Sequence, residues 1–210
     1  MSLTLVIGSK NLSSWSLRGW LAMRLTGAEF EEILIPLGGV DTARRIREHS
    51  PSGKVPLLKT EEDGAIWDSL AISEYLAERF PEAHLWPRGE AARALARSVC
   101  AEMHSGFVAL RSHMPMDLQR QRPLAKVPAE VEADIARVVE LWTLCRQRFG
   151  QDGPFLFGHP SLADAFYAPV ATRLRSYAVE LPPLAKAYVD TIHQWALFQP
   201  WLQAALAERA

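Results

Sequence analysis

The stretch from Val55 to Leu76 reads VPLLKTEEDGAIWDSLAISEYL, a pattern typical of two paired strands followed by a helix. Asp63-Gly64 is a tight-turn signal between two short apolar runs, at 55–59 and 65–67. We therefore expect an antiparallel hairpin there. Apolar residues then return at helical spacing, which predicts a helix from about 69 to 80.

The residues before this hairpin predict a strand, a helix and a second strand, over 3–7, 14–26 and 30–35. Two strands joined by a crossover helix are parallel. A short helix is expected from Asp41 to Glu48, with Asp41 as its N-cap. The order βαβ-α-ββα is the thioredoxin-like arrangement, so we expect an α/β domain over residues 1–80.

After a proline-flanked linker at 81–88, everything up to residue 210 reads as helix. Two long apolar stripes step by three or four residues, which predicts two long helices facing a shared core. The first stripe is Leu95, Val99, Met103, Phe107 and Leu110, and the second is Val131, Ile135, Val138, Trp142, Cys145 and Phe149. Ser161, Pro182-Pro183 and Pro200 mark three shorter helices. We therefore expect an all-α second domain over residues 89–210.

Charge and composition exclude several classes of protein. Lys and Arg number 23 against 24 Asp and Glu, so the net charge of −1 gives no general attraction to nucleic acid or anionic lipid. No apolar run is long enough for a membrane span, and no secretory signal is readable. Two cysteines and dispersed histidines predict neither a disulfide framework nor a metal site. We expect a cytoplasmic protein.

Hydroxyl side chains cluster at 12–18, Leu-Ser-Ser-Trp-Ser-Leu-Arg, where the first helix begins. A helix N-terminus offers free N–H groups and partial positive charge, so it favours an anion. Ser13 and Ser14 are therefore candidates for holding one. The alternative is that one of these serines is only an N-cap.

Two further junctions could hold a ligand. The first is the segment that opens a strand at Ser52-Gly53-Lys54-Val55-Pro56. A cis bond before Pro56 would leave the Val55 amide and carbonyl free to pair with an extended peptide. The alternative is an ordinary trans proline at the start of a strand. Asp68 and Ser69 lie where a strand ends and a helix begins. They could hold an amino-acid head group or could simply cap the helix.

A fourth motif, Ser161-Leu162-Ala163-Asp164, has the form of a capping box and is interpreted as structural. Over nearly its whole length the sequence resembles the glutathione S-transferase family, because the Val-Pro strand, the acid-Ser pair and this box occur in the family's order. The helix junction is most similar to the zeta class, whose pattern is S-S-C-S-W-R. Trp15 and Leu17 depart from that pattern, which puts a zeta-type isomerase activity in doubt.

This resemblance implies glutathione as cosubstrate, no metal, and a homodimer. The first domain has no Cys and its first Tyr is Tyr75, so a serine-type enzyme remains, with Ser13 as the catalytic residue and Ser14 as second choice. The glutathione site implied by the resemblance consists of Ser13, Ser14, Trp15, Lys54, Val55, Pro56, Asp68 and Ser69. The second substrate would lie against the first long helix, at His104, Phe107 and Arg111.

Three functions stay open at this point. The expected one is a glutathione transferase, in which a serine-stabilised thiolate attacks a small electrophile. The second is a glutathione-dependent isomerase or dehalogenase of zeta type, which regenerates glutathione. The third is a binding protein that kept the fold and lost the chemistry.

Overall fold

The computed structural model describes residues 2–208, and its N-terminal part has the predicted thioredoxin-like order. The elements are β1 (Leu3–Gly8), α1 (Ser14–Thr26), β2 (Glu31–Ile35), α2 (Thr42–Arg47), β3 (Leu57–Thr60), β4 (Gly64–Trp67) and α3 (Ser69–Arg79). The four strands form one sheet in the order β2-β1-β3-β4. β1 and β2 are parallel, whereas β3 is antiparallel to both β1 and β4, so the sheet is mixed.

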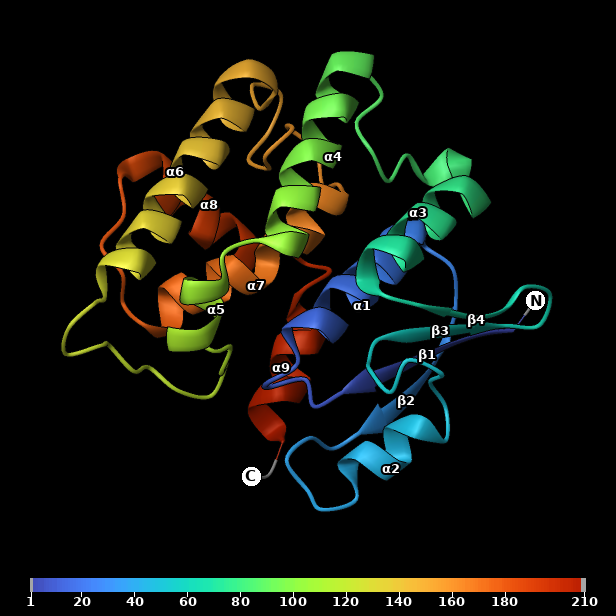
Figure 1. The fold of residues 1–210 in the computed structure, drawn as a ribbon. Helices are drawn as coiled ribbons and strands as arrows, with labels where there is room; N and C mark the ends of the chain where they lie inside the picture. The colour runs from blue at the N-terminus through green and yellow to red at the C-terminus, as the bar shows by residue number, and fades with distance from the viewer. Residues whose placement is uncertain (1, 209–210) are drawn as a thin grey trace.

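Helices cover both faces of this sheet because side chains along β1 alternate between the faces. Leu5 and Ile7 are buried on the face covered by α1 and α3, and they join the main core. Figure 1 shows α2 on the other face of the sheet. Val6 is buried there and packs with Leu57 and with Ile46 of α2. The predicted parallel pairing of the first two strands is confirmed.

The second part of the chain is entirely helical. Its elements are a 3-10 turn η1 (Pro81–Ala83), α4 (Glu90–Ser105), α5 (Val108–His113), α6 (Ala129–Phe149), α7 (Leu162–Ser176), α8 (Pro183–Gln194) and α9 (Gln199–Ala207). α7 is buried almost throughout and packs against α4, α8 and α1, so it joins the two halves (Figure 1). Among residues 2–208, no helix is long and apolar enough to cross a membrane.

The first long helix of this domain is two helices in the structure. α4 ends at Ser105 and α5 begins at Val108, with Gly106 and Phe107 between them. A Cβ on Gly106 would lie 2.8 Å from the Glu102 carbonyl oxygen, so only glycine fits this close approach. Phe107 has a left-handed backbone, φ 54°. The prediction of one continuous helix was therefore wrong at this point, although the residues of its apolar stripe do pack in or against the main core.

The predicted capping box at the start of α7 is confirmed. Asp164 accepts hydrogen bonds from the Ser161 N–H at 2.9 Å and the Leu156 N–H at 3.1 Å. It also accepts one from the Tyr188 hydroxyl at 3.0 Å, which ties α8 to this corner. Burial raises the pKa of the Asp164 carboxyl to about 6, because desolvation outweighs these hydrogen bonds.

Candidate active site

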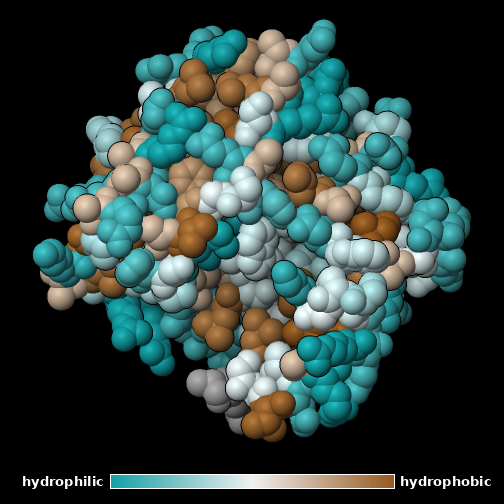
Figure 2. Space-filling model, viewed as in Figure 1, coloured by the Kyte–Doolittle hydropathy of each residue, from teal (hydrophilic) through white to brown (hydrophobic). Residues whose placement is uncertain are grey.

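A cleft of about 870 Å³ lies where the two halves meet. It brings together the three junctions of the N-terminal half that were predicted to bind a ligand and two helices of the second half. Its lining includes all eight residues predicted for the glutathione site: Ser13, Ser14, Trp15, Lys54, Val55, Pro56, Asp68 and Ser69. His104 of α4 and Arg111 of α5 also line it, whereas Phe107 does not and is buried in the core. Figure 2 shows this side of the molecule, on which apolar side chains gather only in small patches.

Ser13 lies at the N-terminus of α1, and its hydroxyl is bonded to a second buried hydroxyl. Ser13 Oγ donates to Ser16 Oγ at 2.7 Å, and Ser16 Oγ also accepts the Gly8 N–H at 3.0 Å. The capping bond from the Ser16 N–H to Ser13 Oγ is 3.4 Å, longer than is usual for a strong cap. Among the residues that the structure describes, no hydrogen-bond partner is found for the Ser14 hydroxyl. Both junction hydroxyls can therefore turn towards an anion in the cleft.

Asp68 has a left-handed φ of 76°, and one of its carboxylate oxygens caps α3, as the capping alternative for this junction predicts. Oδ1 accepts the Leu70 N–H at 2.8 Å, and Oδ2 lies 3.1 Å from His104 Nε2. Next to it, Ser69 Oγ is buried and has no hydrogen-bond partner within residues 2–208. A buried hydroxyl without a partner is costly, so it fits a site that a polar ligand completes.

The bond between Val55 and Pro56 is cis, and Pro56 packs against Gly19 of α1. β3 begins at Leu57, two residues later than expected, so Val55 stands outside the sheet. Lys54 is exposed at the cleft. The arginines of α2 are not part of this lining, and Arg44 pairs with Asp41 and Glu48.

Two arginines and a histidine lie around Trp15. The guanidinium carbon of Arg18 lies 4.2 Å from the indole centroid, that of Arg111 lies 5.4 Å away, and the His104 ring lies 5.2 Å away. Arg18 is fully buried, and none of its three guanidinium nitrogens has a partner among the described residues. Burial, with Arg173 and Arg111 nearby, lowers the pKa of Arg18 to about 9.

Arg173 of α7 completes this cationic cluster, which we define as Arg18, Arg111 and Arg173. Its Nη1 donates to the Pro169 carbonyl at 3.1 Å, but its Nε is buried without a partner in the part of the chain described. Burial and the charge of Arg111 lower its pKa to about 10. Sequence reasoning missed Arg18 and Arg173 as site residues, because they come from helices far apart in the chain. No local pattern brings them together.

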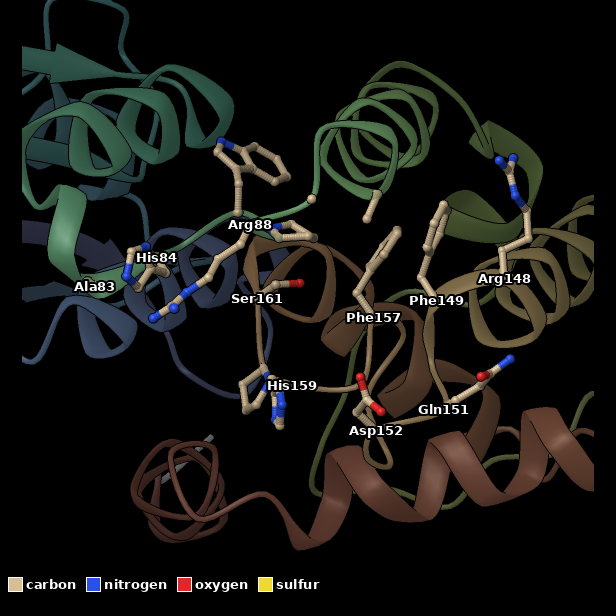
Figure 3. A pocket seen from close by; sticks show the side chains of 15 residues that line it. Ala83, His84, Arg88, Arg148, Phe149, Gln151, Asp152, Phe157, His159 and Ser161 are labelled. Atoms are coloured by element: carbon tan, nitrogen blue, oxygen red, sulfur yellow. The ribbon is translucent and has the colours of Figure 1, made fainter.

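A second cleft, of about 680 Å³, lies on the linker side of the helical domain (Figure 3). His84 and Arg88 of the linker approach it from one side, and Arg148 and Phe149 at the end of α6 from the other (Figure 3). None of the residues predicted for the active site lines it. Within residues 2–208, no group of three or more His, Cys, Asp or Glu side chains is arranged to hold a metal ion.

Comparison with known proteins agrees with this geometry. The N-terminal domain of glutathione S-transferases matches residues 12–79, and the C-terminal domain of the same family matches residues 128–204. The chain therefore belongs to the glutathione S-transferase family. The thioredoxin-like and all-helical halves described above are the two parts of that fold.

Relatives of two kinds are similar to the chain. A maleylacetoacetate isomerase of Pseudomonas aeruginosa is 26% identical over 82% of this chain and 81% of its own. Glutathione S-transferase 1 of Dianthus caryophyllus is 27% identical over 91% of this chain and 88% of its own. A third relative is a maleylacetoacetate isomerase from Anaeromyxobacter dehalogenans, whose crystal structure has glutathione bound in its active site. Its sequence is 27% identical, the match covers 95% of this chain and 94% of that one, and the TM-score is 0.67.

Proposed function

We propose that the chain is a glutathione-dependent enzyme that ionises the glutathione thiol and isomerises a small unsaturated carboxylate. The observation that carries the substrate class is the cationic cluster beside Trp15, which has no carboxylate partner in the described chain. A cleft that Arg111 lines, with the positive charges of Arg18 and Arg173 buried nearby, suits an electrophile that brings its own negative charge. The relatives called maleylacetoacetate isomerase support the reaction type.

Glutathione fits the cleft through its polar ends and its backbone. The Asp68 carboxylate takes the ammonium of the γ-glutamyl residue, and the unpartnered Ser69 hydroxyl takes its carboxylate. The backbone of Val55, outside the sheet, pairs with the cysteinyl residue as an added strand does. Lys54 adds positive charge near the tripeptide. This arrangement leaves the thiol near the start of α1.

The thiol is ionised by the hydroxyls and the helix N-terminus, without a general base. A cysteine thiol has a pKa of about 8.5, and a hydrogen bond to its anion contributes roughly 1.5–3 kcal/mol. The helix N-terminus adds roughly 0.3–1 kcal/mol. Together they lower the thiol pKa by roughly 1.5–3 units. Ser13 is the better donor, since Ser16, 2.7 Å away, can return a hydrogen bond to it when its proton turns to sulfur.

The isomerisation then needs only addition and reversal. The thiolate forms a carbon–sulfur bond to the alkene carbon that lies β to a carbonyl. The electron pair of the double bond moves to the carbonyl oxygen. The former double bond is now single and rotates. Return of the electron pair expels the thiolate and restores the alkene, so glutathione is not consumed. Arg111 holds the substrate carboxylate throughout, and the buried charges of Arg18 and Arg173 stabilise it.

Transferase chemistry on a small electrophile is the second candidate. Trp15 and Leu17 depart from the zeta-class pattern, and the relative from Dianthus caryophyllus is named as a transferase. Counting glutathione separates the two reactions. An isomerase converts a cis unsaturated carboxylate completely with catalytic glutathione, whereas a transferase consumes one glutathione per product. If calorimetry shows no glutathione binding at all, both proposals fail and the binding-protein alternative stands.

A homodimer is our proposal for the quaternary structure, on the basis of family membership. Trp67 of β4 is 48% exposed, beside the start of α3, and offers apolar surface to a second subunit. Sedimentation equilibrium of the wild-type protein tests it, and a monomer at micromolar concentration contradicts it.

A further inference from the structure

Residues 9–13, between β1 and α1, form a loop that we call the serine loop. Asn11 lies in it, two residues before Ser13, and connects it to the helical domain. Its side-chain oxygen accepts the N–H groups of Leu118 at 2.7 Å and Gln119 at 3.0 Å. Its side-chain nitrogen donates to Asp117 Oδ1 at 3.1 Å. Asn11 is buried, and this one amide thus binds three consecutive residues from beyond α5.

The end of the chain holds the same loop from a second side. The Glu208 carboxylate accepts the backbone N–H groups of Lys10 at 2.6 Å and Asn11 at 2.9 Å. Gln119 Nε2 donates to the Ala205 carbonyl at 2.9 Å and the Glu208 carbonyl at 2.6 Å. The indole of Trp201 donates to the Lys10 carbonyl at 2.9 Å. The serine loop, the segment after α5 and the end of α9 therefore form one network.

Bonds inside the serine loop are all short in range. The N–H groups of Leu12 and Ser13 return to the Ser9 carbonyl, at 3.2 and 2.8 Å, which closes a turn. Such a turn fixes its own shape but not its direction relative to the helical domain. Asn11 supplies the side-chain hydrogen bonds that join this loop to the segment following α5, the helix that carries Arg111.

We propose that Asn11, held in place by Glu208, is a positioning residue that sets the distance between the Ser13–Ser14 hydroxyls and the second-substrate half of the cleft. This inference rests on the proposed function, because it assumes that these hydroxyls face the thiol. An amide that accepts two hydrogen bonds and donates one sets direction more tightly than apolar packing does, since hydrogen bonds weaken steeply when misaligned. Asn11 itself does not line the cleft.

Asn11→Ala and Glu208→Ala test the proposal, with Tyr188→Phe as the matched control. The control removes a buried hydrogen bond of the helical domain, from Tyr188 to Asp164, and neither of these residues lines the cleft. The pKa of glutathione's thiol in each complex is followed by the ultraviolet absorbance of the thiolate. We expect Asn11→Ala and Glu208→Ala each to raise this pKa by about 1 unit. Each should also lower kcat/KM roughly tenfold, through a fall in kcat more than a rise in KM. Tyr188→Phe should lower only the Tm.

A swap of the two side chains provides the rescue. Asn11→Asp places a second carboxylate opposite Asp117 and should shift the thiol pKa as Asn11→Ala does. Adding Asp117→Asn restores one donor facing one acceptor and should return the pKa towards that of the wild type. The proposal is overturned if wild type ionises bound glutathione and the folded Asn11 and Glu208 variants match Tyr188→Phe. If wild type itself binds no glutathione, the proposed function fails instead.

Discussion

His104 Nε2 lies 3.1 Å from Asp68 Oδ2, so a helix of the second half contacts the carboxylate that caps α3. The other oxygen of Asp68 is occupied by the Leu70 N–H. The oxygen that faces the cleft is thus the one shared with His104. In our proposal this carboxylate also takes the ammonium of glutathione, which places the two half-sites side by side.

Asp68→Asn should weaken glutathione binding, because an amide cannot attract the ammonium as a carboxylate does. We expect the Kd, measured by calorimetry, to rise roughly tenfold, which corresponds to about 1.4 kcal/mol. His104→Gln is the matched control. It removes the partly exposed contact between His104 and Asp68, which contributes little, and should change the Kd less than roughly threefold. Equal affinity in Asp68→Asn and wild type would contradict the assignment.

Ser69→Ala should separate binding from stability. The Ser69 hydroxyl is buried without a partner in the described chain, so its removal should leave the free energy of unfolding unchanged or raise it by up to about 1 kcal/mol. Glutathione affinity should fall by roughly 1–2 kcal/mol, because the carboxylate of glutathione loses a donor. Urea unfolding and calorimetry measure the two effects. A variant that is less stable but binds equally well shows that the hydroxyl is structural.

Arg111→Ala should discriminate between charged and neutral substrates. We expect kcat/KM for an unsaturated carboxylate to fall roughly 10–100-fold, because a charge-assisted hydrogen bond is lost. The methyl ester of the same substrate is the control, and its kcat/KM should change little. If acid and ester lose activity equally, Arg111 acts through packing against Trp15 and the substrate class is wrong.

Much of this site was predictable from the sequence, because its parts lie at junctions between elements. Ser13, Val55 and Asp68 each mark the start of a helix or strand, and a thioredoxin-like order brings such junctions to one edge. Phe107 was placed at the second-substrate site by the family resemblance, whereas its helical spacing predicts the core position that the structure shows. That spacing does not predict the end of α4 at Ser105, where a Cβ on Gly106 would meet the Glu102 carbonyl oxygen. The periodicity of apolar residues does not record so close a backbone approach.

The cationic cluster shows a second limit. Arg18 was visible in the serine motif, but its burial and its lack of a partner depend on α7. Arg173 lies 155 positions later, and the spacing of residues says nothing about such a pair. Asn11 is similar, since its partners are Asp117, Leu118 and Gln119.

Stability should depend on pH through Asp164. Burial raises its folded-state pKa to about 6, above the unfolded value of about 3.9. Between these two pKa values the folded state binds more protons than the unfolded state. The contribution of protonated Asp164 to the free energy of unfolding is therefore fully present below about pH 4 and is lost as the pH rises through about 6. The loss is on the order of 2–3 kcal/mol.

Urea unfolding of wild type and Asp164→Asn measures this dependence. Because the variant does not titrate at this position, its disadvantage relative to wild type should be largest near pH 4 and shrink by about pH 7. A gap that widens as pH rises would show that hydrogen bonds to the Asp164 carboxylate outweigh its desolvation.

The ultraviolet titration of glutathione bound to wild type, Ser13→Ala and Ser14→Ala tests the central claim most directly. We predict a thiol pKa of roughly 5.5–7 in the wild-type complex, against about 8.5 for the free cysteine thiol. Ser13→Ala should raise the bound value by about 1–2 units, and Ser14→Ala by less. A thiol that titrates as free glutathione does in the wild-type complex, or that keeps its lowered pKa in both variants, would contradict the account.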